Sequence, residues 1–195
     1  VDLRLAGYIA PAIGGAITLA DIQIALGRLR AARTTFEQGL EWAAMPGGLV
    51  RQGAADMHVG LAALFVEQDD LEAAEQHLLA RQALGELAAL PQHPYRWRAT
   101  MARIREARGD QASALALLDE AERVYDGNFS PNVRPIAALK ARLWVAQGRL
   151  AEAHGWVRAQ GLSPDDDLSY LREFEHITLA RVLLQDPAVL LLDEA

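Results

Sequence analysis

One short pattern occurs four times along the chain at nearly even spacing. It is centred on four turn positions, Gly27, Asp69, Gly109 and Gly148, which are 42, 40 and 39 residues apart. An alanine lies seven residues before each centre and another lies five residues after it: Ala20 and Ala32, Ala62 and Ala74, Ala102 and Ala114, Ala141 and Ala153. A short pattern that recurs at this spacing, with small residues on both sides of a turn, indicates a stack of helical hairpins.

This period predicts an all-α fold of tetratricopeptide type, in which helical hairpins form a solenoid wound into a right-handed superhelix of about nine or ten helices. We expect a single repeat domain over residues 1–195, in a chain that is part of a larger protein. Its hairpins are expected at residues 12–43, 50–89, 95–125, 133–160 and 165–195. Arrays of this kind usually present a binding surface, so we do not expect an enzyme.

The sequence contains two kinds of residues that are expected to begin helices. Asp70 and Asp110 follow their turns directly, where a carboxylate suits the first turn of a helix. Ser163 and Pro164 are expected to cap and begin the first helix of the fifth hairpin. That helix should bury one face made of apolar residues at three- and four-residue steps: Leu168, Leu171, Phe174, Ile177, Leu179, Val182 and Leu183.

Composition and charge disfavour several classes of function. The net charge is −7, and an acidic surface repels phosphate backbones, so these residues are not expected to bind nucleic acid. The absence of cysteine excludes disulfides and thiolate metal sites. No apolar run reaches the ~18 residues of a membrane-spanning helix, and no signal peptide is visible. We therefore expect a cytoplasmic location and no membrane partner.

The end of the sequence resembles part of a nucleotide site. LARVLLQDPAVLLLDEA, residues 179–195, imitates the Walker B region of a transporter ATPase, with Asp193 and Glu194 as its acidic pair. A working site also needs a glycine-rich phosphate loop that ends in lysine. The sole lysine, Lys140, has no glycine near it. The simpler interpretation is that the two acids lie on the surface early in a helix, so we expect no nucleotide cofactor.

No other motif indicates catalysis or metal binding. The five histidines, His58, His77, His93, His154 and His176, include no pair at metal-ligand spacing on one helix. There is also no G-x-S-x-G motif for a serine nucleophile. We interpret the histidines as surface or core residues of helices.

Arginines recur at one place in the repeat. Arg103, Arg142 and Arg181 each follow the small residue of a first helix and are 39 residues apart. Because first helices of stacked hairpins line the concave face, these positions should form a column, which begins at Asp21 and Ala63. Arg96 extends its basic end, with Trp97 and Trp144 nearby in sequence.

Two interpretations of this column remain open. Guanidinium groups suit carboxylates and phosphates, so Arg96, Arg103, Arg142 and Arg181 form a candidate binding site for an anionic ligand. Alternatively, each arginine pairs with an acid of a neighbouring helix, such as Glu106 or Glu173.

Two segments resemble a known family. HVGLAALFVEQDDLEAAEQHL, residues 58–78, resembles a helix pair of MalT-like transcriptional regulators of the large ATP-binding LuxR group. GLSPDDDLSYLREFEHITLARVLL, residues 161–184, resembles another segment typical of them. The resemblance covers nearly the whole chain and identifies it as their helical-repeat region.

The resemblance implies a function in sensing. In such proteins the repeat region receives an inducer or partner and controls self-association. ATP binds an N-terminal domain, and DNA binds a C-terminal helix-turn-helix; neither has a counterpart in these residues. The alternative is a plain tetratricopeptide adaptor that binds proteins and takes no small ligand. A P-loop ATPase before the chain and a helix-turn-helix after it would distinguish the regulator from the adaptor.

Overall fold

A computed structural model describes residues 9–44, 53–80, 93–125 and 134–185. These residues form helices and no strand, so the predicted all-α class is confirmed. The helices are α1 (Ile9–Ala25), α2 (Leu29–Ala43), α3 (Ala54–Glu67), α4 (Leu71–Ala80), α5 (His93–Ala107), α6 (Gln111–Arg123), α7 (Ile136–Ala146), α8 (Leu150–Gln160), the short 3-10 helix η4 (Tyr170–Arg172) and α9 (Glu173–Leu184).

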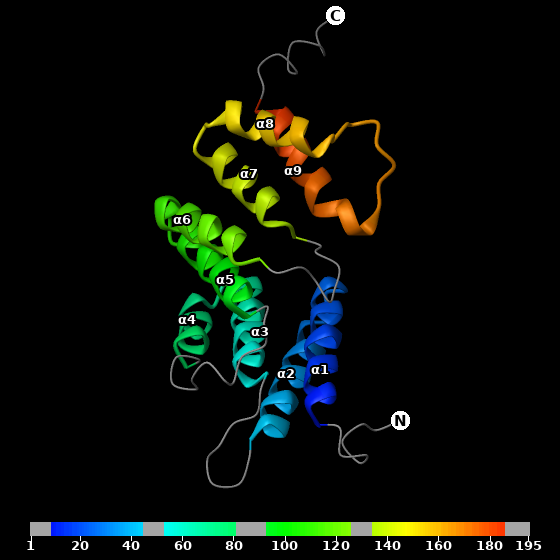
Figure 1. Cartoon of the computed structure of the whole chain (residues 1–195), viewed down its shortest axis with the longest axis vertical. Helices are drawn as coiled ribbons and strands as arrows, with labels where there is room; N and C mark the ends of the chain where they lie inside the picture. Colours follow the sequence, from blue (N-terminus) through cyan, green and yellow to red (C-terminus); the bar gives the residue numbers. More distant parts are fainter. Residues whose placement is uncertain (1–8, 45–52, 81–92, 126–133, 186–195) are drawn as a thin grey trace, which may run out of the picture.

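Consecutive helices pair into hairpins, and the hairpins stack. α1 packs on α2, α3 on α4, α5 on α6 and α7 on α8. Each second helix also packs on the first helix of the next hairpin, as α2 does on α3 and α6 on α7. The array runs along the long axis of the molecule, from α1 and α2 near one end to α7, α8 and α9 near the other (Figure 1). The tetratricopeptide-like solenoid predicted from the period is therefore confirmed.

The four turn centres share one backbone conformation. Gly27, Asp69, Gly109 and Gly148 have φ values of 69°, 60°, 80° and 70°. At each turn the centre donates its N–H to the carbonyl three residues back, and the next residue donates to the carbonyl five back. This pair of bonds is the Schellman motif that ends a helix with a left-handed residue. The repeat read from the sequence is thus a repeat of helix termination, in which Asp69 takes the place of glycine.

The eight repeated alanines are buried where the two helices of a hairpin meet. Seven of them have no exposed surface and the eighth, Ala102, is only 2% exposed. Helices of adjacent hairpins also pack closely against each other. A methyl group built on Gly60 of α3 would lie 2.2 Å from the ring of Phe36 on α2. Small residues therefore set the distance between helices, as the pattern predicts.

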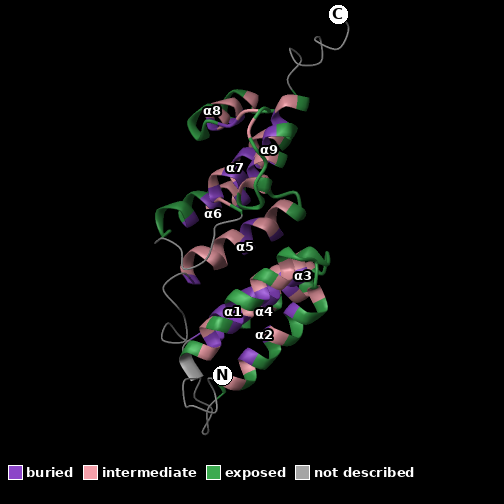
Figure 2. Cartoon of the chain, turned by 90° about the vertical axis from the view of Figure 1, so that its right-hand side faces the viewer, coloured by how far each residue is buried: buried purple, intermediate pink, exposed green. Residues whose placement is uncertain are grey.

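The core is continuous along the array in three overlapping parts. The first joins α1 to α4 with Met101 and Ile104 of α5, the second joins α5, α6 and α7, and the third joins α7, α8 and α9. Figure 2 shows the same arrangement, with buried residues on the helix faces that meet and exposed residues on the outer faces. Each hairpin thus buries its apolar face against its neighbours, as in other repeat proteins.

Side chains cap two of the second helices as expected. Asp110 accepts a hydrogen bond from the N–H of Ser113 at 3.1 Å, and Asp70 accepts one from Ala73 at 3.0 Å. Both carboxylates satisfy an N–H group that the first helical turn leaves free.

The expected start of the last helix is wrong. Residues 161–169 form turns and extended chain, and α9 begins only at Glu173. The Ser163 hydroxyl accepts a bond from the N–H of Asp165, while the N–H of Ser163 donates to the Asp166 carboxylate. These local bonds compete with helix formation, as serine and aspartate often do.

The expected buried face of that helix is correct only in part. Leu179 and Val182 are buried and Phe174 and Leu183 are half-buried, whereas Leu168, Leu171 and Ile177 are exposed. Leu168 and Leu171 precede α9, so they do not follow its periodicity. The expected partner helix of α9, with Asp193 and Glu194, lies outside the described residues.

Candidate functional site

The arginine column lies on successive first helices. Arg103 is on α5 and Arg142 on α7, each six residues before the turn centre of its hairpin, and Arg181 is on α9. Arg103 and Arg142 are half-buried, whereas Arg181 is exposed. The preceding first helices, α1 and α3, carry Asp21 and Ala63 at this position.

Arg103 is held by an acid of the preceding hairpin. Its Nη2 donates to Oε1 of Glu67 on α3 at 2.9 Å, and Arg134 donates to the same oxygen. Burial alone would raise the pKa of the Glu67 carboxyl, but the two guanidinium groups outweigh it and the pKa is lowered. Glu67 therefore stays ionised and neutralises part of this cluster.

Arg96 is held in the same way, across a longer distance along the chain. Its Nη2 donates to both carboxylate oxygens of Asp21 on α1, at 3.0 and 3.1 Å. Burial raises the pKa of the Asp21 carboxyl, and Arg96 opposes that shift. The pair links α1 to α5 past the one intervening hairpin, α3 and α4.

Arg142 and Arg181 differ from these two. The guanidinium carbon of Arg142 lies 5.3 Å from the ring centre of Phe174 on α9, and that of Arg134 lies 5.9 Å from the same centre. Within the described part of the chain, neither Arg142 nor Arg181 has a carboxylate within ion-pair distance. Burial lowers the pKa of Arg142, as does the nearby positive charge of Arg181, whereas Glu106 raises it.

The structure thus divides the four arginines into two groups. Arg96 and Arg103 form ion pairs between hairpins, as the second interpretation predicts, although their partners are Asp21 and Glu67 instead of Glu106 or Glu173. Arg142 and Arg181 remain as neighbouring cations, and Arg142 lies over the Phe174 ring. The crevice beside Arg103, lined by Ala102, Glu106, Leu118, Leu139 and Leu143, has no room for a water molecule.

Two histidines that are far apart in the sequence meet in the second hairpin. Nδ1 of His58 on α3 lies 3.0 Å from Nδ1 of His77 on α4, and the His77 ring stacks on Phe65. Burial lowers the pKa of both imidazoles. The neighbouring His77 adds to the shift at His58, and Arg33 adds to that at His77 while Glu37 opposes it. Histidine spacing within one helix does not predict this pair, because its two members lie on different helices.

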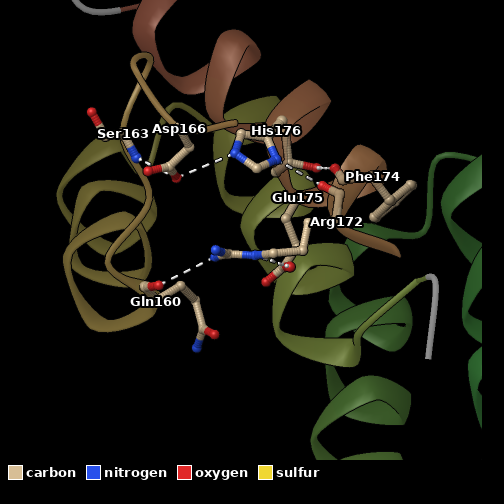
Figure 3. Close-up of polar contacts among 8 residues, drawn as sticks. Gln160, Ser163, Asp166, Arg172, Phe174, Glu175 and His176 are labelled. Carbon is tan, nitrogen blue, oxygen red and sulfur yellow. Dashed lines mark hydrogen bonds and ion pairs between the residues drawn. The ribbon is translucent and has the colours of Figure 1, made fainter. Parts of the chain in front are cut away.

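A second polar cluster fixes the segment before α9. Asp166 accepts the N–H of Ser163 at 3.0 Å and faces Nε2 of His176 at 3.2 Å (Figure 3). Arg172 donates to Glu175 and, at 3.4 Å, to the carbonyl of Gln160 at the end of α8. Both halves of the cluster use neighbouring residues to hold the turn against α9, so its geometry indicates a structural role.

A comparison with protein families matches nearly the whole chain. The model of the MalT-like TPR region covers residues 6–188. The chain belongs to the MalT-like TPR family. No curated protein and no solved structure matches significantly.

Membership of the MalT-like TPR family confirms the resemblance found in residues 58–78 and 161–184. The matched region includes every described hairpin, the histidine pair and all four arginines of the column. The chain is therefore a helical-repeat module of the MalT type.

Its sole lysine lies on α7, where it pairs with Asp119 and Glu122 of α6 at 2.8 and 2.9 Å.

The described residues provide neither a metal-binding cluster nor a membrane-spanning helix. They contain no group of three or more histidine, cysteine or acidic side chains placed to hold a metal ion. In the same part of the chain, no helix is both long and apolar enough to cross a membrane.

Proposed function

We propose that this MalT-like TPR region is the sensing module of a cytoplasmic transcription regulator of the LuxR type, which receives an anionic ligand or an acidic partner segment at Arg142 and Arg181. In this proposal the whole protein binds ATP and DNA through other domains. The chain itself is not an enzyme and takes no cofactor. Receipt of the ligand would change the self-association of the regulator.

One observation carries the proposal. Two neighbouring guanidinium groups have no carboxylate within ion-pair distance among the described residues of a chain whose net charge is −7. Like charges repel, so an anion that bound both would relieve that repulsion and gain charge-assisted hydrogen bonds. Phe174 adds an aromatic surface beside Arg142. Arg96 and Arg103, which are already paired, would hold the hairpins in place.

The experiment is a binding measurement on the full chain with a fluorescent oligoglutamate peptide as the probe, followed by anisotropy. The double variant Arg142→Gln, Arg181→Gln should weaken binding by about tenfold or more, because each lost charge-assisted contact contributes about 1.5–3 kcal/mol before screening. Binding should also weaken with added salt, since the charges are within reach of solvent ions. The melting temperature of the variant should stay unchanged.

A matched control is available on another helix. Arg123 is an exposed arginine on α6, a second helix, so Arg123→Gln removes one positive charge outside the arginine column. It should leave the affinity nearly unchanged. Equal affinity of the double variant and the natural chain would remove the proposed site. A fall in melting temperature of the double variant would instead indicate a structural role for the two arginines.

The plain adaptor remains the second candidate function, because tetratricopeptide-like arrays bind peptide segments of many kinds. A P-loop ATPase and a helix-turn-helix encoded on either side of this chain would favour the regulator. If the oligoglutamate probe binds but neither domain is encoded, the adaptor is favoured.

A further inference from the structure

Six charged side chains lie close enough to act on one another along the first helices from α3 to α9. Four are arginines and two are glutamates, and we call them the charge cluster: Glu67, Arg103, Glu106, Arg134, Arg142 and Arg181. Because arginine outnumbers glutamate by two, the charge cluster has a formal excess of two positive charges. The chain as a whole has a net charge of −7, so this excess is local.

Glu67 shows how the arginines of the charge cluster surround an anion. Its Oε1 accepts a hydrogen bond from Nη2 of Arg103 at 2.9 Å and another from Nη1 of Arg134. These bonds join α3 to α5 and to the residues just before α7. One carboxylate is thus shared by two guanidinium groups, so the charge cluster lacks negative charge even where it is paired.

Arg142 lies where the remaining positive charge is concentrated. Its guanidinium carbon is 5.3 Å from the ring centre of Phe174. Burial and the positive charges of Arg181 and Arg134 lower the pKa of Arg142, whereas the two glutamates of the charge cluster oppose that shift. A guanidinium group that stacks on an aromatic ring is already oriented, so it loses less freedom when it binds an anion.

We propose that the ligand group of this site is a phosphate monoester in its dianionic form, bound by Arg142 and Arg181. This inference rests on the proposed function, because it names the ligand class of the same site. Glu67 already occupies the other two arginines of the charge cluster. A phosphate monoester carries about −1.5 to −2 charges at pH 7 and three acceptor oxygens, which suit two guanidinium groups.

Carboxylates fit the same charge excess less well. A single carboxylate would neutralise only one of the two excess charges. Two carboxylates would have to lie side by side between Arg142 and Arg181, where they would repel each other. A phosphate monoester holds both negative charges on one tetrahedral group, so it avoids this repulsion.

Methyl phosphate and methyl sulfate test the ligand class, because the two esters have nearly the same shape. The phosphate gains its second charge above a pH of about 6, whereas the sulfate keeps a single charge. Dissociation constants for the full chain would be measured by NMR titration at constant ionic strength. At pH 7.5 we expect methyl phosphate to bind about tenfold more tightly or better, because it gains one additional charge interaction.

The same comparison at pH 5.5 is the internal control. Methyl phosphate then carries mainly one charge, so its advantage should shrink to about threefold or less. Protonation of histidines in the chain acts on the binding of both esters alike, so it does not produce this change in preference.

Two variants change the charge cluster in opposite directions. Arg181→Gln leaves an excess of one charge, so it should weaken the binding of methyl phosphate by about tenfold and reduce its advantage over methyl sulfate. Glu106→Gln raises the excess to three, so it should strengthen the binding of methyl phosphate by about threefold or more. Arg123→Gln lies outside the charge cluster and should leave both dissociation constants nearly unchanged.

A free phosphate ester and a phosphorylated side chain offer the same group. A short peptide with one phosphoserine distinguishes these two sources. Equal affinity of this peptide and methyl phosphate would support a free ester as the ligand. Tighter binding of the peptide, lost without its phosphate, would support a phosphorylated partner segment.

Equal affinity of methyl phosphate and methyl sulfate at pH 7.5 would overturn the phosphate class. A preference for phosphate that Arg181→Gln leaves unchanged would overturn its assignment to this site. If Arg181→Gln lowers the melting temperature, Glu106→Gln decides the assignment, because an unstable fold does not strengthen binding. Oligoglutamate binding that depends on Arg142 and Arg181, without any preference for methyl phosphate, would remove only the phosphate class. Absence of binding by oligoglutamate and by both esters would remove the proposed function as well.

Discussion

At the scale of single residues, the left-handed turn positions decide where each first helix ends. Three of the four are glycines, which adopt positive φ without a steric penalty, and the fourth is Asp69 at φ 60°. Aspartate tolerates this region better than most residues but at some cost. The stability of the chain can therefore be increased at the turn of the second hairpin.

We expect Asp69→Gly to stabilise the chain by about 0.5–1 kcal/mol, because glycine removes the clash of the β-carbon in the left-handed region. Chemical denaturation of the two proteins measures the difference. Gly109→Ala is the reciprocal change at an equivalent turn. Its added methyl group meets no atom within 4 Å, so its expected loss of about 1 kcal/mol would be due to the backbone alone. No gain from Asp69→Gly would show that the aspartate side chain offsets its strain.

The paired imidazoles of His58 and His77 predict a pH dependence. Both pKa values are lowered in the folded state, so the unfolded chain binds more protons just below the ordinary histidine pKa of about 6.5. Stability should therefore fall as the pH drops below about 6.5, by at most about 1.4 kcal/mol per pH unit for each proton. The contribution of Glu67, whose pKa is lowered, is lost only at more acidic pH, below its ordinary value.

Unfolding free energies measured between pH 7.5 and 5.5 would check this pH dependence. His77→Gln and His58→Gln each remove one half of the pair, so each should flatten the curve. An unchanged slope in both variants would mean that other groups set the pH dependence.

At the scale of helices and turns, much was predictable because it depends on local sequence. The repeated small residues and turn centres located the hairpins, and Asp70 and Asp110 located two helix starts. The start of α9 was not predictable from Ser163 and Pro164, because the Asp166 side chain bonds the N–H of Ser163 and faces His176, ten residues further on. The partners of Arg96 and Arg103 were missed for a similar reason. Asp21 and Glu67 come from other hairpins, 75 and 36 residues away.

The helix-to-helix contact at Gly60 gives a prediction at this scale. Gly60→Ala should destabilise the chain by about 1–3 kcal/mol, because the new methyl group requires the Phe36 ring to move in a packed core. Gly155→Ala on α8 is the matched control, since a methyl group there meets no atom within 4 Å and alanine favours a helix. Thermal denaturation of the two variants would compare them. A Gly60→Ala chain as stable as the natural one would mean that α2 and α3 are less closely packed than described.

At the scale of the whole molecule, the hairpins stack in a regular order, but the ion pairs of the arginine column are distributed unevenly along the array. Ion pairs between hairpins neutralise Arg96 and Arg103, whereas Arg142 on α7 and Arg181 on α9 have no carboxylate within ion-pair distance among the described residues. Because each hairpin contacts mainly its neighbours, a ligand near α7 and α9 would act first on the last hairpins.

The register of the hairpins is the foundation of these conclusions, and one pair of variants on α6 tests it most directly. Ala114 is buried against α5, whereas Ala116, two residues further on, is exposed. We expect Ala114→Leu to lower the free energy of unfolding by about 1–3 kcal/mol through overpacking. Ala116→Leu should change it by no more than about 0.5 kcal/mol. Equal stability of the two variants, or a larger loss at Ala116, would contradict the register and with it the assignment of the helix faces that meet.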